Sequence, residues 1–263
     1  MYDGVVKTDN WMEEHFEQPW IMGKMARPEI KDEHDFYQYL VQFGMYEPSK
    51  QSFKVFETLK KEKVWERVAS IYQSYRKKWR GPAVKIYLFP VNQNNRFFRQ
   101  QLRGRAGLSF SDSLFLFLSD GLEEKELEAL FVHEYHHATR MGKYKKEKDD
   151  YTLLDSILFE GLAEVAVLNC CGKKYTAFWT DLHNKDFLKR RTETAYKPHF
   201  HIKRNHPLHD QLLFGGRKGI PHMMGYAVGY EIAKGYIKEN KITILETFSL
   251  PSEKVLEKNQ FLH

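Results

Sequence analysis

Three histidines and a glutamate fall within five consecutive residues of the segment "VHEYHH", residues 132–137. Among them, His133, Glu134 and His137 have the spacing HExxH. Positions i and i+4 of a helix lie one turn apart on the same face, so two imidazoles with this spacing can bind one Zn²⁺. Glu134 would then reach a water on the metal, whose pKa zinc lowers to about 7. The pattern predicts a hydrolytic zinc site with Glu134 as general base.

A HExxH pattern can arise by chance in a chain with twelve histidines, so its context matters. A helical projection gathers one mostly apolar face, made of Leu127, Leu130, Phe131, Glu134, Ala138 and Met141. His133 and His137 lie along the edge of that face, where buried polar groups need partners, and a metal would supply one for both. His136 projects about 100° away from His137, on the side opposite Glu134. We therefore expect His136 to lie beside the metal rather than on it.

A third ligand is offered by "FEGLAE", residues 159–164, where Glu160 and Glu164 stand one helical turn apart. They border an apolar stripe formed by Leu154, Ile157, Leu158, Gly161, Val165 and Leu168. A glycine inside a helix costs about 1 kcal/mol relative to alanine, so Gly161 predicts that another helix packs closely there. We take Glu160 as the third ligand and expect Glu164 to orient a ligand histidine. The alternative is that both are solvated surface acids.

The strands expected before the motif are "AVKIYLFP", half-buried by its alternation, and "GLSFS" and "LFLFLS", joined by a tight turn at Asp112. Upstream, residues 29–44 and 51–79 have helical patterns, and "RGP" ends the second. Residues 1–28 are expected to form an irregular arm held to the body by Trp11, Phe16 and Trp20.

Downstream of the strands, helices are expected over 119–142, capped by Ser119 or Asp120 and ending at Gly142, and over 151–172. Further helices are expected within 176–192 and over 222–240, with a short one after Pro251. Residues 193–221 are typical of a long loop. The order predicts an α+β fold in which a small mixed or antiparallel sheet precedes a helical bundle that carries HExxH. Residues 1–80 would form a helical region packed on the body, and residues 81–263 one compact core.

Composition limits the classes of protein that remain. Hydrophobic residues make up 42% of the chain, which excludes intrinsic disorder. The net charge of +6 is spread over short runs, which is typical of a solvated surface rather than a nucleic-acid patch. We expect neither a secretory signal nor a membrane span, because no apolar run approaches roughly 20 residues. Cys170 and Cys171 are adjacent and unsuited to a relaxed disulfide, so we expect a cytoplasmic protein.

"HEYHH" followed by "EGLAE" resembles the gluzincin class of zinc metallopeptidases, whose third ligand is a glutamate on a following helix. More closely, "VHEYHH", "FEGLAE" and the late "IPHMMGYAVGYEIAKGYI" resemble the YjaZ-type predicted zinc-dependent proteases, over roughly residues 80–250. The resemblance implies a zincin-like fold, one zinc per chain and hydrolysis of peptide bonds in peptide or protein substrates. Phe159 departs from the asparagine of the related "NEGFA" segment, which puts a contact to substrate or base in doubt.

The resemblance also implies a tyrosine or histidine that stabilises the tetrahedral oxyanion. Tyr226 is the favoured residue, with Tyr230 and His222 as the other candidates, and the alternative is that Tyr226 is an ordinary core residue. The class further implies that an edge strand around "AGLSFS", at Gly107 and Leu108, pairs with an extended substrate.

Two other functions stay open at this point. The first is a metal-binding regulatory domain without turnover. The second is binding of single-stranded nucleic acid by the arginines and aromatics of residues 96–105. The four histidines of "HFHIKRNHPLHD" suit no standard ligand set, so we expect them in a loop that lines or covers the cleft rather than in a second metal site.

Overall fold

The computed structural model describes residues 4–144, 146–216 and 219–262, so residues 1–3 of the expected arm and 217–218 of the expected loop lie outside the described residues. The fold is mixed α+β, mostly helical, with a three-stranded sheet. The chain divides into two compact units, Met1–Ala138 and Thr139–His263. This division falls inside helix α6, Glu124–Lys143, and not near residue 80, where the sequence pattern changes.

The sheet of the first unit has the strand order β1-β3-β2. Its strands are β1, Lys85–Pro90, β2, Arg105–Ser109, and β3, Ser113–Leu118. The central strand β3 runs parallel to β1 and antiparallel to β2, so the sheet is mixed. The three predicted strands and the turn at Asp112 are confirmed. The expectation that β1 is half-buried is wrong, because every residue of β1 after Lys85 is buried.

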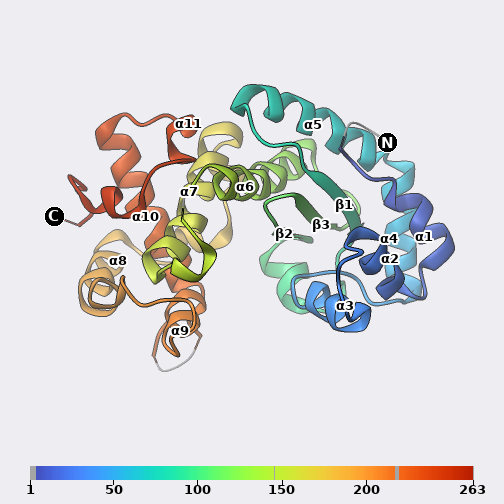
Figure 1. Ribbon diagram of the computed structural model, residues 1–263, viewed down its shortest axis with the longest axis horizontal. Coiled ribbons are helices and arrows are strands. Elements are labelled where there is room, and N and C mark those ends of the chain that lie inside the picture. The colour runs from blue at the N-terminus through green and yellow to red at the C-terminus, as the bar shows by residue number, and fades with distance from the viewer. Residues whose placement is uncertain (1–3, 145, 217–218, 263) are drawn as a thin grey trace. The chain divides into compact units, whose positions relative to one another are not determined.

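Helices cover both faces of this sheet, which explains the burial of β1. On one face, the Tyr87 hydroxyl donates to the carbonyl of Ala26, and Phe115 meets Phe36 edge-on at 5.9 Å between ring centroids. These partners belong to α2, Pro19–Ala26, and α3, Glu33–Gln42. Successive side chains of a strand point to opposite faces, so Gly107 and Ser109 of β2 face the other way, towards α6. Figure 1 shows α2 and α3 beside the sheet, together with α1, Thr8–His15, and α4, Lys50–Lys61.

Two expectations about the N-terminal helices are wrong. The described part of the expected irregular arm, residues 4–28, is not irregular, since it includes α1, Thr8–His15, as well as α2, which starts at Pro19. The stretch 51–79 is two helices, α4, Lys50–Lys61, and α5, Val64–Trp79. The chain turns between them at Lys63, whose φ is 52°. The helical pattern runs through this turn without a glycine or proline, so no sequence signal marks it.

Helix α6 starts at Glu124, so neither Ser119 nor Asp120 caps it. The chain turns first at Gly121, whose φ is 71°, and the carboxylate of Glu126 accepts from the N–H of Glu123 just before the helix. The predicted acidic first turn is present in Glu124 and Glu126, where it suits the positive end of the helix dipole. Gly142 lies within the last turn rather than after it.

The second unit is built on two long helices, α7, Leu153–Cys171, and α10, Met224–Asn240, which pack against each other. Three short helices, α8, Lys185–Arg191, α9, His209–Phe214, and α11, Ile244–Thr247, accompany them. Single turns of 3-10 or π helix complete the unit: η2 (Lys148–Asp150), η3 (Lys173–Tyr175), η4 (Phe178–Asp181), η5 (Thr192–Tyr196), η6 (Lys197–His199) and η7 (Ser252–Leu256). The expected loop 193–221 therefore contains η6, most of η5 and the short helix α9, while the rest of its described part is non-helical.

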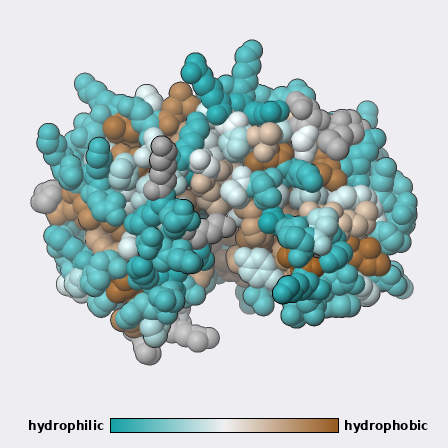
Figure 2. Space-filling view, viewed as in Figure 1, coloured by the Kyte–Doolittle hydropathy of each residue, from teal (hydrophilic) through white to brown (hydrophobic). Residues whose placement is uncertain are grey.

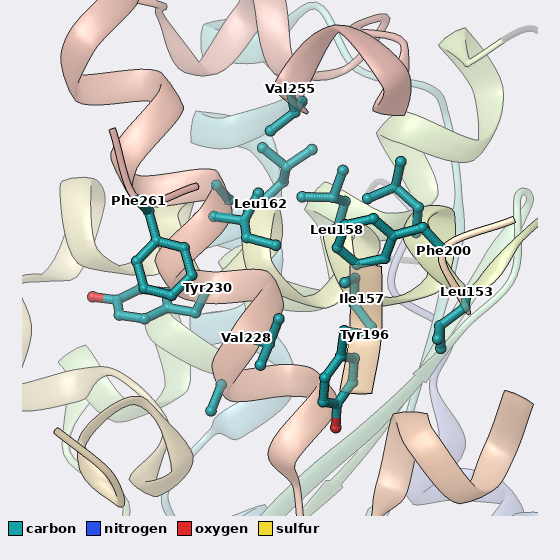
Figure 3. Close-up of a cluster of buried hydrophobic side chains, with 14 of the residues drawn as sticks. Leu153, Ile157, Leu158, Leu162, Tyr196, Phe200, Val228, Tyr230, Val255 and Phe261 are labelled. Atoms are coloured by element: carbon teal, nitrogen blue, oxygen red, sulfur yellow. The ribbon is translucent and has the colours of Figure 1, made fainter. Parts of the chain in front are cut away.

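The core of the second unit lies along the contact of α7 and α10 (Figure 3). Ile157, Leu158 and Leu162 of α7 are fully buried there. Tyr196 adds a ring from η5, and its hydroxyl donates to the carbonyl of Leu212, so the buried polar group is satisfied. This core fixes α7, the helix on which Glu160 and Glu164 stand.

The surface in Figure 2 is mostly hydrophilic, with hydrophobic residues in small scattered groups. The large exposed hydrophobic residues are Met25, Tyr39, Phe53, Leu182, Phe214 and Leu245. Within residues 4–144, 146–216 and 219–262, none of the helices is both long and apolar enough to span a lipid bilayer.

Candidate metal centre

Helix α6 places His133 and His137 side by side. The Nε2 atoms of the two imidazoles lie 3.1 Å apart, and the rings are nearly perpendicular, at 89°. This arrangement follows from the four-residue spacing, which brings side chains of successive turns together. His137 is 9% exposed and His133 is half-buried, so both rings lie at the border between the interior and solvent.

Glu160 lies close to the two histidines. One ligand atom from each of His133, His137 and Glu160 can be chosen so that all three lie within 4.8 Å of one another. This is a possible metal site, because zinc in hydrolases takes three protein ligands of these types and keeps a further position open. Among the described residues, the group does not include His136.

His136 points to a different part of the interior. Its imidazole is fully buried and meets the indole of Trp79 edge-on, at 6.2 Å between centroids and 88°. Trp79 is the last residue of α5, and its indole also stacks on the ring of Tyr135. The apolar face of α6 that the sequence pattern predicts is mostly buried. The pattern did not indicate the second buried side of α6, which is covered because α5 also packs on this helix.

Glu134 is 6% exposed and meets strand β2. The hydroxyl of Ser109 lies 2.5 Å from Oε2 of Glu134 and 2.9 Å from its backbone carbonyl oxygen. A Cβ on Gly107 would stand only 2.5 Å from three atoms of the Glu134 side chain. Ser109 was not foreseen from the sequence. The signal that could have found it is the alternation of β2, which puts Gly107 and Ser109 on one face.

Helix α7 is fixed at its start and along its length. Thr152 caps it through a capping box with Asp155, and Gly172 follows its last residue, as predicted. The expectation for Gly161 is confirmed, since its missing Cβ would lie 2.2 Å from the carbonyl oxygen of Gly229 on α10. Two glycines thus let α7 and α10 approach backbone to backbone beside Glu160.

The two glutamates of "FEGLAE" have different surroundings. Glu160 is half-buried, while Glu164 is 2% exposed and accepts a hydrogen bond from the backbone N–H of Ala177. The alternative that both are solvated acids is therefore wrong for Glu164. Its expected role in orienting a histidine stays a prediction.

The candidates for stabilising an oxyanion differ in exposure. Tyr226 is half-buried and packs edge-on against Trp179, at 5.4 Å between ring centroids, whereas Tyr230 is 1% exposed, and burial raises its pKa. His222 is exposed and precedes α10. On β2, Leu108 faces away from Gly107, since it pairs with Phe115 on the other side of the sheet.

The two remaining motifs, the histidine-rich segment 199–209 and the Arg/aromatic segment 96–105, each contain a buried side chain. In the histidine-rich segment, His209 is 1% exposed and contacts Ser156 at 2.9 Å and Asp210 at 2.8 Å, so it is a core histidine rather than part of a loop. In the Arg/aromatic segment, η1, Phe97–Gln101, buries Phe98, which removes one ring from any stacking surface.

Comparison with known proteins agrees with this geometry. Residues 64–257 match the family described as "Predicted Zn-dependent protease (DUF2268)". The chain belongs to this family. The "Uncharacterized protein YjaZ" of Bacillus subtilis (strain 168) is 38% identical over 239 residues, which cover 90% of this chain and 91% of that protein. The resemblance predicted from the motifs is confirmed, and it extends into the first 80 residues, where no motif indicated it. No solved structure gives a significant match.

Proposed function

We propose that this member of the predicted Zn-dependent protease family is a zinc metallopeptidase with a zincin-like fold. The observation that carries the proposal is the grouping of His133, His137 and Glu160 within 4.8 Å, with Glu134 next to the first histidine. The donor set fits zinc, since two ligand atoms at 2.0–2.1 Å in a tetrahedral site stand about 3.3 Å apart, near the 3.1 Å between the two Nε2 atoms. One zinc per chain is expected.

The residues around the metal would divide the chemistry between them. When bound, zinc would polarise the attacking water and the scissile carbonyl. Glu134 would accept a proton from that water and pass it to the leaving amine. Tyr226 would donate to the oxyanion, and its partial exposure favours it over the buried Tyr230. Glu164 would orient a ligand histidine.

The substrate would be an extended peptide or protein segment. Strand β2 stands at the end of the sheet order and pairs with β3 on one side, so its other edge can take a substrate strand by backbone hydrogen bonds. A Cβ on Gly107 of β2 would stand 2.5 Å from the Glu134 side chain, so a substrate strand paired with β2 at Gly107 would lie near the general base. A cytoplasmic location belongs to the same proposal, and it agrees with the adjacency of Cys170 and Cys171, which disfavours a relaxed disulfide.

The test is metal analysis joined to cleavage of a peptide library. We expect about one zinc in the parent, none after His133→Ala or His137→Ala, and much weaker binding after Glu160→Ala. Glu134→Gln should keep zinc and lose about 10²- to 10⁴-fold in kcat, because a general base contributes about that much. Glu124→Gln, an exposed glutamate on the same helix, is the matched control. Tyr226→Phe should lower kcat, and Tyr230→Phe should not.

Each outcome decides part of the proposal. Equal cleavage by the parent and Glu134→Gln would disprove the mechanism. Full zinc content in Glu160→Ala would remove that residue from the ligands. Zinc binding without any cleavage would instead favour a metal-binding domain that lacks turnover.

A further inference from the structure

Two residues on one face of strand β2, Gly107 and Ser109, border the side chain of Glu134. Ser109 contributes a hydroxyl that donates to Glu134 Oε2 at 2.5 Å, at the short end of the range for O–H···O hydrogen bonds. Gly107 contributes the space for the same side chain, because an added Cβ would approach its Cγ, Cδ and Oε1 to 2.5 Å. Both residues lie 25 or more positions before Glu134 in the sequence.

Gly107 has no conformational reason to be glycine. It is not among the glycines with a positive φ, so alanine fits its backbone. Glycine weakens a strand interior and marks places where another group approaches closely. The close group here is the Glu134 side chain, and the glycine is explained by it.

The single proton of Ser109 has two acceptors in reach, Oε2 and the backbone carbonyl oxygen of Glu134. The hydroxyl therefore ties both the side chain and the backbone of Glu134 to strand β2.

We propose that Ser109 is a positioning residue for the general base, and that Gly107 keeps the space in which Ser109 holds it. This inference rests on the proposed function for its catalytic meaning, but the placement of Glu134 can be tested without activity. Catalysis is sensitive to such placement, since a displacement of about 1 Å of a reacting group can cost about 100-fold in rate. Nothing in the HExxH pattern itself assigns a residue to this task.

The experiment compares Ser109→Ala, Ser109→Thr and Gly107→Ala in the zinc-loaded full chain. Ser111→Ala is the matched control, because Ser111 is exposed just beyond the same strand. We expect Ser109→Ala to keep its zinc, leave KM within about twofold and lower kcat about 10- to 100-fold. Ser109→Thr keeps the hydroxyl and should restore most of kcat, while Gly107→Ala should lower kcat at unchanged zinc content.

Crystal structures of the parent and of Ser109→Ala provide the second measurement. The Glu134 carboxylate should leave its position beside residue 109 in the variant and keep it in the parent. An unmoved carboxylate, or a kcat equal to that of the parent, would overturn the proposal. If the parent cleaves no peptide, the proposed function fails, and the position of Glu134 in the two structures alone decides whether Ser109 positions it.

Discussion

Gly161→Ala is the most direct test of how the helices beside Glu160 pack. The new methyl would stand 2.2 Å from the Gly229 carbonyl oxygen and 2.7 Å from the N atom of Tyr230, both backbone atoms. No side chain can turn aside, so α7 and α10 must separate by about 1 Å to restore ordinary contact. Overpacking of this kind costs about 1–3 kcal/mol, and contact with backbone favours the upper value.

Alanine has a higher helix propensity than glycine by about 1 kcal/mol, which offsets part of the overpacking cost of about 3 kcal/mol. The free energy of unfolding should therefore fall by about 2 kcal/mol. The corresponding fall in Tm is about 4–8 °C for a chain of this size. Gly142→Ala is the matched control, because Gly142 is also helical and a Cβ there meets nothing within 4 Å. That substitution should stabilise by about 0.5–1 kcal/mol.

Urea and thermal unfolding followed by circular dichroism would measure both variants. Zinc affinity is a second measurement, since Glu160 precedes Gly161 and should move with α7. The reasoning would be refuted if Gly161→Ala stabilised the protein as Gly142→Ala does, because close packing of α7 on α10 would then cost nothing.

Two further predictions concern buried polar groups. Burial alone would raise the pKa of Asp155, but hydrogen bonds from Lys146 and Thr152 outweigh it and hold the pKa below its usual value. The ionised Asp155 therefore stabilises the fold above about pH 4, and this stabilisation is lost as the pH falls through the folded pKa. Asp155→Asn should lower the free energy of unfolding in urea by about 2–3 kcal/mol at pH 7 and by less near pH 2. An equal loss at the two pH values would contradict this. Thr8 is fully buried, donates to the Leu88 carbonyl at 2.6 Å and accepts from the Trp65 indole at 3.0 Å. Thr8→Val should cost about 1–3 kcal/mol in the same assay, against under about 0.5 for Thr58→Val on α4, and similar values for the two would count against the buried network.

Local patterns in the sequence determined much of the helical structure and one part of the candidate site. The spacing of His133 and His137 fixes their separation, because one turn of helix brings positions i and i+4 together wherever that helix lies. Thr152 and Gly172 mark the ends of α7 through bonds made within a few residues. Gly161 indicated a close helix neighbour, although it did not say which helix that was.

Only the tertiary structure decided the contacts made across long stretches of chain. Ser109 and Glu134 meet because β2 lies against α6, and no local rule relates two residues 25 positions apart. The same holds for Gly161 and Gly229, whose backbones approach only after α7 and α10 have packed. The parallel pairing of β1 with β3 also depends on the route of the chain between them. Side-chain chemistry and spacing therefore named the HExxH residues and pointed to Glu160, while packing decided what stands beside them.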